Sequence, residues 1–242
     1  MDKILGHMGY GTRSELKKLI KSGFVTVNGK QVKDSGWNAD PVRDEIIFNG
    51  ERVRYRQYVY IMMNKPPGVV SATEDARERT VIGLLREDHA AFHPFPAGRL
   101  DKDTEGLLLL TNDGALAHNL LSPKKHVPKT YYAEVEGEVT EADAHAFAKG
   151  VALDDGVLTQ PAALQIWHSG PRSQIELTIT EGKFHQVKRM FEAVGKKVLY
   201  LKRLSMGSLT LDPALSPGQS RELTEEELQA LREETEGFRF AE

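Results

Sequence analysis

The 242-residue sequence contains no cysteine. This absence excludes disulfide scaffolds, cysteine-rich zinc sites and catalysis by a thiolate. The chain also has no run of about 18 apolar residues, which a transmembrane helix would need, and no basic-then-apolar leader. We therefore expect a cytoplasmic protein that does not enter a membrane.

Nucleotide-binding signatures are missing as well. The sequence has no Gly-x-x-x-x-Gly-Lys-Ser/Thr phosphate loop, and no predicted strand precedes Gly9-Tyr10-Gly11. Zinc-dependent deamination and thiolate addition to a pyrimidine are disfavoured by the lack of cysteine. What remains is the chemistry of a carboxylate, and we expect neither a cofactor nor a metal.

The composition, 40% hydrophobic and 28% charged, is that of a globular chain with one medium core and a smaller second one. Its charges are segregated. Residues 1–33 hold seven Lys/Arg against two acids, and residues 183–203 hold seven against one, whereas residues 211–242 hold nine acids and three arginines. The two basic segments are therefore candidates for contact with an anionic partner.

The N-terminal segment predicts a helix followed by a hairpin. Thr12 and Glu15 match a capping box, so we expect a helix over residues 13–22. Asn28-Gly29 then joins two short alternating runs, which is typical of a hairpin. Basic side chains at helical spacing share one face of this helix: Arg13, Lys17, Lys18 and Lys21.

The stretch YGTRSELKKLIKSGFVTVNGKQVKDSG resembles the small RNA-binding module named after ribosomal small-subunit protein four. Taken alone, the basic helix face could equally be a solvated surface. The resemblance implies that it binds RNA, together with Lys30 in the hairpin. We place this module and its linker at residues 1–56.

Residues 57–242 read as one α+β domain with a mixed sheet, because strands and helices alternate without a regular βαβ rhythm. An apolar strand ends at Lys65-Pro-Pro-Gly68. Further strands are expected at residues 106–111, 130–136, 174–180 and 197–203. Helices are expected at residues 115–121, 140–149, 185–194 and 224–234, the last opened by a capping box at Thr224 and Glu227.

The stretch Ala97 to Ala115, AGRLDKDTEGLLLLTNDGA, places a cluster of acids before four leucines. Asp101, Asp103 and Glu105 match the first half of a calcium loop, but its twelfth position is Asn112 rather than Glu, and no entering helix precedes it. Leu107 to Leu110 form a continuous apolar run that predicts a strand buried on both faces. A carboxylate just before such a rigid strand is well placed for catalysis, although a charged surface turn is the common alternative.

Four ordered motifs resemble those of RsuA-type pseudouridine synthases, which carry the same N-terminal module. They are Lys65-Pro-Pro-Gly68; Gly98-Arg-Leu-Asp101 with Thr104-Glu-Gly-Leu-Leu-Leu-Leu-Thr111; Lys129-Thr-Tyr131; and Glu181-Gly-Lys-Phe-His-Gln-Val-Lys-Arg-Met190. They span about 125 residues in the same order. The resemblance implies a two-domain enzyme that needs no cofactor.

The resemblance also implies catalytic roles. Asp101 would be the catalytic aspartate acting on a flipped-out uridine, with Asp103 and Glu105 as bystanders; whether it adds to the base, captures the sugar or removes a sugar proton stays open. Lys188 would keep Asp101 charged, the alternative being a phosphate contact. Tyr131 would stack on the target base, while Tyr132, on the opposite strand face, would pack.

Further residues are expected to contact RNA. Arg99 would do so beside the catalytic aspartate, the alternative being a structural ion pair with Asp103. The remaining candidates in the catalytic domain are Lys65, Lys183 and Arg189, and those in the N-terminal module are Arg13, Lys17, Lys18, Lys21 and Lys30.

The expected reaction is therefore isomerisation of one uridine to pseudouridine in ribosomal RNA. The motif from His185 to Met190 favours 16S small-subunit rRNA, with uridine 516 as the candidate position. The alternatives are a sister enzyme acting on 23S rRNA and a non-catalytic RNA-binding assembly factor. The expected partner is rRNA or a small-subunit assembly intermediate, bound by a monomer.

Overall fold

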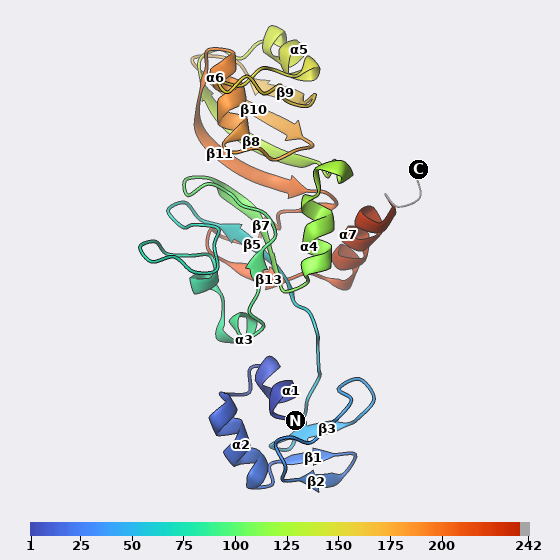
Figure 1. The fold of residues 1–242 in the computed structure, drawn as a ribbon. Helices are drawn as coiled ribbons and strands as arrows, with labels where there is room; N and C mark the ends of the chain where they lie inside the picture. The colour runs from blue at the N-terminus through green and yellow to red at the C-terminus, as the bar shows by residue number, and fades with distance from the viewer. Residues whose placement is uncertain (238–242) are drawn as a thin grey trace. The chain divides into compact units, whose positions relative to one another are not determined.

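The computed structural model describes residues 1–237 (Figure 1). Contacts divide the chain into two compact units. The first comprises Met1–Val59 and Leu85–Pro94, and the second comprises Tyr60–Leu84 and the chain from Phe95 onward. The expected boundary between residues 56 and 57 stays a prediction.

The first unit consists of helices packed on a small sheet of order β2-β1-β3-β4. The expected helix is present as α2, and the Thr12–Glu15 capping box is formed. The structure adds α1 and the second strand pair, which the sequence analysis did not predict. The elements are α1 (Asp2–His7), α2 (Arg13–Lys21), β1 (Val25–Val27), β2 (Lys30–Val32), β3 (Ile46–Phe48) and β4 (Glu51–Arg52).

A segment from the middle of the sequence also belongs to this first unit. It carries the short helix α3 (Glu87–Ala90) and the buried Phe92. The Phe92 ring lies 5.2 Å from the His7 ring, edge to face, and the Arg56 guanidinium lies 5.3 Å from its centre. Aromatic and cation–π contacts of this kind hold the segment on the first unit.

The second unit is built on a nine-stranded mixed sheet, which confirms the expected α+β fold. Its main path runs β13-β5-β7-β11-β8-β10-β9, and only β7 and β11 pair in parallel among the pairs described. The strands are β5 (Tyr60–Lys65), β6 (Phe95–Pro96), β7 (Glu105–Thr111), β8 (Lys129–Glu136), β9 (Ala163–His168), β10 (Arg172–Ile179), β11 (Lys197–Met206), β12 (Leu209–Thr210) and β13 (Ser220–Glu222).

Strand β7 is the rigid centre of the unit. Leu107, Leu108, Leu109 and Leu110 are all fully buried, as the apolar run predicted. Gly106 has φ of +103°, and a Cβ there would lie 2.2 Å from the carbonyl oxygen of Arg203 on β11. Only glycine therefore allows the backbones of β7 and β11 to approach this closely.

Helices cover the sheet at several places, and every helix expected in this unit is present, with its ends at most three residues from the predicted ones. Helices α4 and α7 lie side by side, and Leu116, Leu120 and Leu231 join them to the core (Figure 1). Phe147 of α5 meets Phe191 of α6 edge to face at 5.1 Å. The helices are α4 (Gly114–Leu121), α5 (Glu141–Lys149), α6 (Gln186–Ala193) and α7 (Glu225–Gly237), with short 3-10 turns η1 (Ile82–Leu84) and η2 (Pro123–Lys125).

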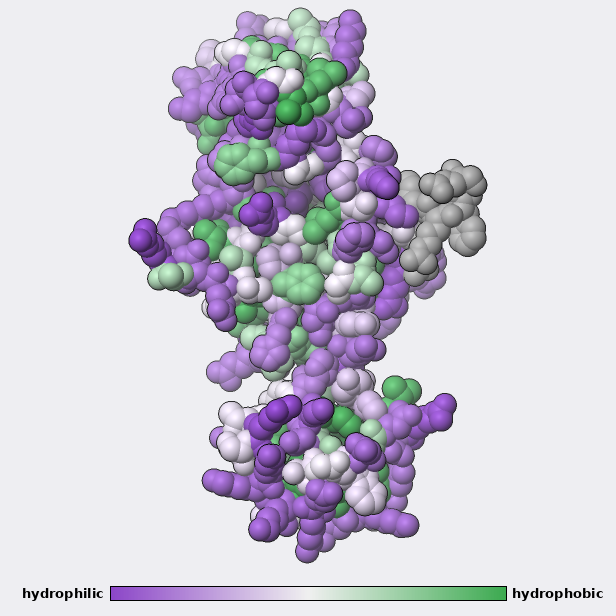
Figure 2. All heavy atoms as spheres, viewed as in Figure 1, coloured by the Kyte–Doolittle hydropathy of each residue, from purple (hydrophilic) through white to green (hydrophobic). Residues whose placement is uncertain are grey.

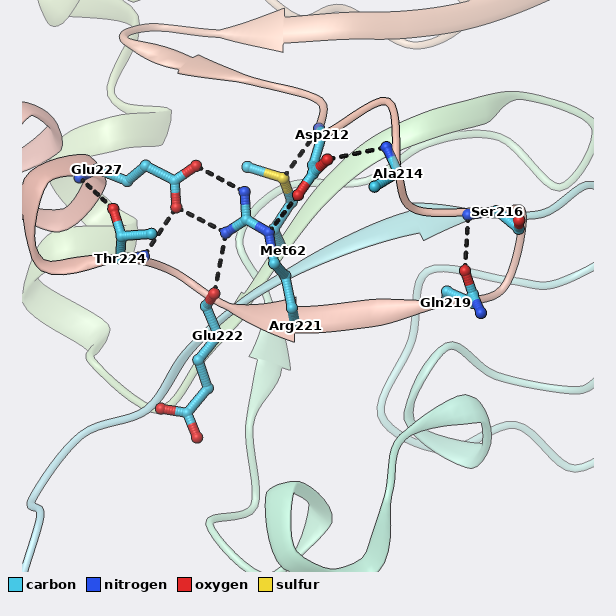
Figure 3. A network of polar contacts seen from close by, with 9 residues as sticks. All are labelled: Met62, Asp212, Ala214, Ser216, Gln219, Arg221, Glu222, Thr224 and Glu227. Carbon is cyan, nitrogen blue, oxygen red and sulfur yellow. Dashed lines mark hydrogen bonds and ion pairs between the residues drawn. The ribbon is translucent and has the colours of Figure 1, made fainter.

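A polar network ties the edge strand β13 to the acidic C-terminal helix (Figure 3). Arg221 donates to Asp212 at 2.6 Å and to both carboxylate oxygens of Glu227 at 2.8 Å. Glu227 in turn accepts the backbone N–H of Thr224, which forms the predicted capping box. With Leu231 fully buried, α7 is an integral part of the unit rather than simply a solvated helix.

Candidate active site

The second unit contains a cleft of about 770 Å³. Its walls come from elements far apart in the sequence: the loop before β7, the inner face of β8, β11, and the loop that leads into α6. Four predicted site residues line it, namely Arg99, Asp101, Tyr131 and Lys183. The fold thus gathers residues that the sequence separates by more than eighty positions.

The loop that carries Asp101 is anchored on both sides. The Ser71 hydroxyl donates to the carbonyl of Leu100 at 3.0 Å and accepts its N–H at 3.1 Å. The N–H of Thr104 donates to the carbonyl of Asp101 at 3.1 Å, which closes a turn before β7. A side chain held this way loses little freedom when substrate binds.

Lys65 stabilises the same loop by hydrogen bonds to its backbone. It is fully buried, and its ammonium donates to the carbonyls of Pro66, Lys102 and Thr104 at 3.1, 3.3 and 2.9 Å. Burial lowers the pKa of Lys65 to about 8, although the nearby carboxylates, Asp103 first, favour its charge. The prediction that Lys65 contacts RNA is wrong for this conformation, because no part of the side chain reaches solvent.

A charged cluster surrounds the Asp101 carboxylate. Lys188 Nζ lies 3.0 Å from Asp101 Oδ2 and 2.7 Å from Asp103 Oδ1. Burial alone would lower the pKa of Lys188, but its hydrogen bonds and ion pairs with Asp103 and Asp101 raise it above its ordinary value. Lys188 is therefore a cation near neutral pH, and it stands within direct ion-pair distance of the candidate catalytic aspartate.

Asp103, which was expected to be a bystander in the chemistry, also binds Lys188. Its burial tends to raise the pKa of the carboxyl, but the hydrogen bond and charge of Lys188 outweigh this and lower it. Asp103 therefore shares the ammonium that also faces Asp101. The Asp103 side chain is 73% exposed, whereas that of Asp101 is 26% exposed. Asp103 is therefore the more solvent-exposed of the two carboxylates that meet Lys188.

The three acids of the loop do not converge on one point. Asp101 and Asp103 meet Lys188, whereas Glu105 accepts a hydrogen bond from the Tyr200 hydroxyl at 3.1 Å.

The sequence also has one His-x-x-x-His pair, His89 and His93. No group of three His, Asp or Glu side chains within residues 1–237 is arranged to hold a metal ion.

The two tyrosines of β8 lie on opposite faces of the strand. Tyr131 is 8% exposed and lines the cleft. Tyr132 packs between Trp167 and Tyr200, with ring centres 5.9 and 6.1 Å away. Only Tyr131 is therefore placed to meet a base in the cleft.

The other predicted RNA contacts of this unit differ in their surroundings. Arg99 is exposed at the cleft, and within the described chain it forms no ion pair with Asp103, which binds Lys188 instead. Lys183 pairs with Glu181. Arg189 forms ion pairs with Asp154 and Asp155, so two carboxylates already occupy the guanidinium that was expected to meet phosphate.

The cleft also contains four residues to which the sequence analysis gave no role. His185 places Nε2 3.5 Å from Asp101 Oδ1, and the Phe184 ring stacks on it. On the floor, Lys129 donates to the carbonyl of Val127 at 2.8 Å, and Arg203 donates to that of Leu107 at 2.8 Å. His185, Phe184 and Lys129 belong to two of the four sequence motifs, Lys129–Tyr131 and Glu181–Met190. Their membership of these motifs could have indicated that they line the site.

Burial, followed by the neighbouring charge of Arg203, lowers the pKa of Lys129 to about 8 against the attraction of Glu234. Both cations are at least nine-tenths buried, and neither forms an ion pair within the described residues. The floor of the cleft is therefore electropositive, which suits an anionic polymer.

In the first unit, all five predicted RNA-binding cations are solvent-exposed: Arg13, Lys17, Lys18, Lys21 and Lys30. Leu16 and Ile20, on the other side of α2, are fully buried. The helix is thus amphipathic, with its basic face turned outward.

Comparison with known proteins identifies the family of this chain. The sequence profile of the RNA pseudouridylate synthases matches residues 59–193, which include Asp101, Tyr131 and Lys188. The chain belongs to the RNA pseudouridylate synthase family. As a pseudouridine synthase it is an isomerase acting on RNA, and its N-terminal residues 1–46 match the S4 domain.

Relatives of this pseudouridine synthase share nearly its whole length. "Uncharacterized RNA pseudouridine synthase YtzG" of Bacillus subtilis (strain 168) is 55% identical, over 96% of this chain and 98% of the relative. "Ribosomal small subunit pseudouridine synthase A" of Escherichia coli (strain K12) is 40% identical, over 94% and 97%. "Ribosomal large subunit pseudouridine synthase B" of Bacillus subtilis (strain 168) is also 40% identical, over 96% and 95%. The RsuA-type resemblance is confirmed.

A crystal structure of a pseudouridylate synthase shares the fold, with a TM-score of 0.68 and 38% sequence identity over 95% of this chain and 98% of that one. No helix within residues 1–237 is both long enough and apolar enough to cross a membrane.

Proposed function

We propose that this pseudouridine synthase isomerises one uridine of 16S small-subunit rRNA, with uridine 516 as the candidate position. The observation that carries the proposal is the Asp101 carboxylate, held on an anchored loop that lines the cleft of about 770 Å³, with Lys188 at 3.0 Å. The motif from His185 to Met190 supports the small-subunit target. Action on 23S rRNA is the second candidate, because the small- and large-subunit relatives are equally identical to this chain.

The reaction requires no oxidant and no added group. The bond between ribose C1′ and uracil N1 breaks, the base turns, and a new bond joins C1′ to C5. The hydrogen on C5 is lost and N1 gains one, so the overall change is an isomerisation. A base must leave its helix to enter the cleft, which costs a few kcal/mol. Asp101 is the group proposed to act on the flipped nucleotide.

Tyr131 is proposed to bind the flipped base by stacking, a contact that contributes about 1–3 kcal/mol. Lys188 is proposed to keep Asp101 ionised when the base displaces water, because desolvation by itself favours the protonated carboxyl. Arg99 and Lys183, both at the cleft, are proposed to meet the RNA backbone. The buried Lys65 is assigned to holding the loop instead.

The partner is proposed to be rRNA or a small-subunit assembly intermediate, bound by a monomer. The S4 domain would grip it through the exposed basic face of α2, and Lys30 of β2 would extend this surface. Phosphate contacts supply affinity without sequence preference, so choice of the uridine rests with the second unit.

The target is testable in cells. In a strain that lacks this gene, we expect one pseudouridine to disappear from 16S rRNA and none from 23S rRNA, as mapped by carbodiimide labelling and primer extension over both molecules. Expression of the intact chain should restore it. Loss from 23S rRNA alone would select the large-subunit alternative. Normal patterns in both, with rRNA binding retained, would support the non-catalytic alternative.

Neutralising the basic face of α2 should weaken RNA binding. For the triple variant Lys17→Ala, Lys18→Ala and Lys21→Ala, we expect the plot of log affinity against log salt to become shallower by about 0.7–0.9 for each phosphate that the variant no longer neutralises. Filter binding at several salt concentrations measures this. Lys149→Ala, at an exposed position on α5, is the control and should leave the slope unchanged. An unaltered slope in the triple variant would contradict the proposed grip.

A further inference from the structure

The side chain of Phe184 is unusually exposed for its size. At 71% exposure it exceeds every other exposed aromatic side chain in the described part of the chain, the next being Trp167 at 56%. Figure 2 shows hydrophobic side chains among hydrophilic ones on the surface around α5, α6 and β9. A scattered apolar residue needs no explanation by itself. Phe184 differs because it lines the cleft that contains Asp101.

One face of the Phe184 ring is already stacked. Its centre lies 3.7 Å from that of the His185 ring, and the two planes are inclined by 18°. His185 has a left-handed backbone, with φ of 49°, at the N-cap of α6, and its Nε2 lies 3.5 Å from Asp101 Oδ1. The His185 imidazole therefore lies next to the Asp101 carboxylate, and the Phe184 phenyl ring stacks on that imidazole.

The backbone beneath this stack is fixed. The N–H of Lys183 donates to the side chain of Gln186 at 2.8 Å, and the carbonyl of Phe184 accepts from Arg189 at 3.4 Å. Arg189 is itself held by Asp154 and Asp155. The ring is thus presented to solvent from an ordered support, so that binding would cost little conformational entropy.

We infer that Phe184 stacks on a nucleobase of the substrate strand next to the target nucleotide. The inference rests on the proposed function and gives Phe184, at the rim of the same cleft, a role in binding the substrate. Tyr131, which is only 8% exposed, is the residue proposed to stack on the flipped base itself. Extrusion of that base leaves its neighbours without a stacking partner, and an aromatic face accepts any base. The flanking cations Lys183 and Arg99 favour a nucleic-acid strand over a protein or a lipid.

The test compares four variants by steady-state kinetics and by filter binding on the same RNA: Phe184→Ala, Phe184→Leu, Phe184→Tyr and the control Trp167→Ala. Loss of one stacked base should raise KM and Kd roughly 5- to 150-fold in Phe184→Ala. Phe184→Leu, which keeps apolar bulk without a π-face, should behave similarly. Phe184→Tyr and Trp167→Ala should stay within about twofold of wild type, and kcat at saturating RNA should change little in all four.

Three results would overturn the inference: an unchanged KM in Phe184→Ala, wild-type behaviour of Phe184→Leu, or an equal loss in Trp167→Ala. The melting temperature of each variant checks that it has folded, and because the side chain is exposed we expect little change. Product formation by wild type reports on the proposed function separately. If wild type makes no pseudouridine, that proposal fails, whereas the Kd values still decide the stacking contact.

Discussion

Replacement of Asp101 by asparagine should abolish pseudouridine formation while leaving RNA binding within about threefold of wild type. Asparagine has nearly the same shape but cannot act as an ionised carboxylate. Loss of a group that touches the reacting atoms commonly reduces turnover by about 10³-fold or more. The carboxylate is 26% exposed and the loop anchors are backbone contacts of Leu100 and Thr104, so the loop should keep its conformation. Single-turnover product formation and filter binding on the same RNA measure the two effects.

The chain supplies a matched control two residues away. Asp103 also meets Lys188, yet it is 73% exposed and faces solvent. Asp103→Asn should therefore retain activity within about tenfold of wild type. This allowance covers the weakened contact between residue 103 and Lys188. Unchanged product in Asp101→Asn would remove Asp101 from the catalytic role. Equal losses in both variants would mean that the charged cluster as a whole, rather than one carboxylate, is required.

The second large effect is expected for Lys188→Met. At an effective dielectric constant of about 20, two unit charges 4 Å apart attract by about 4 kcal/mol, which corresponds to roughly 10³-fold in rate. The pair is partly open to solvent, so we expect a loss of about 10²- to 10³-fold.

Lys188→Arg keeps the charge and should restore most of the rate. The competing role, a phosphate contact, predicts another pattern: Lys188→Met would weaken RNA binding and reduce its salt dependence. Rates measured at saturating RNA, with binding measured in parallel at several salt concentrations, separate the two roles.

Local sequence was sufficient for the elements that it controls. The capping box at Thr12 and Glu15 fixed the start of α2, and the apolar run Leu107–Leu110 predicted the doubly buried β7. These patterns depend on neighbours within a few residues. The candidate catalytic residues were found through motif resemblance, and the structure then placed Lys188 beside Asp101.

What the sequence could not supply are contacts that only the folded chain creates. Lys65 was expected to contact RNA, but its side chain is fully buried. The carbonyls of Lys102 and Thr104, 37 and 39 residues further on, close over it. Arg189, which was predicted to meet phosphate, pairs with Asp154 and Asp155, 35 and 34 positions away, and its contact with RNA stays a prediction. Nothing local in the sequence signals such partners.

The excursion of residues 85–94 into the first unit affects how the protein can be divided. The main chain passes between the two units at residues 59/60, 84/85 and 94/95, so no single cut separates them. A fragment that begins at Tyr60 would still carry Phe92, now without the His7 and Arg56 side chains that cover it. It would expose an aromatic surface that the intact protein hides, and such a surface favours aggregation. Independent study of the two halves therefore calls for excision of this segment or co-expression, rather than simple truncation.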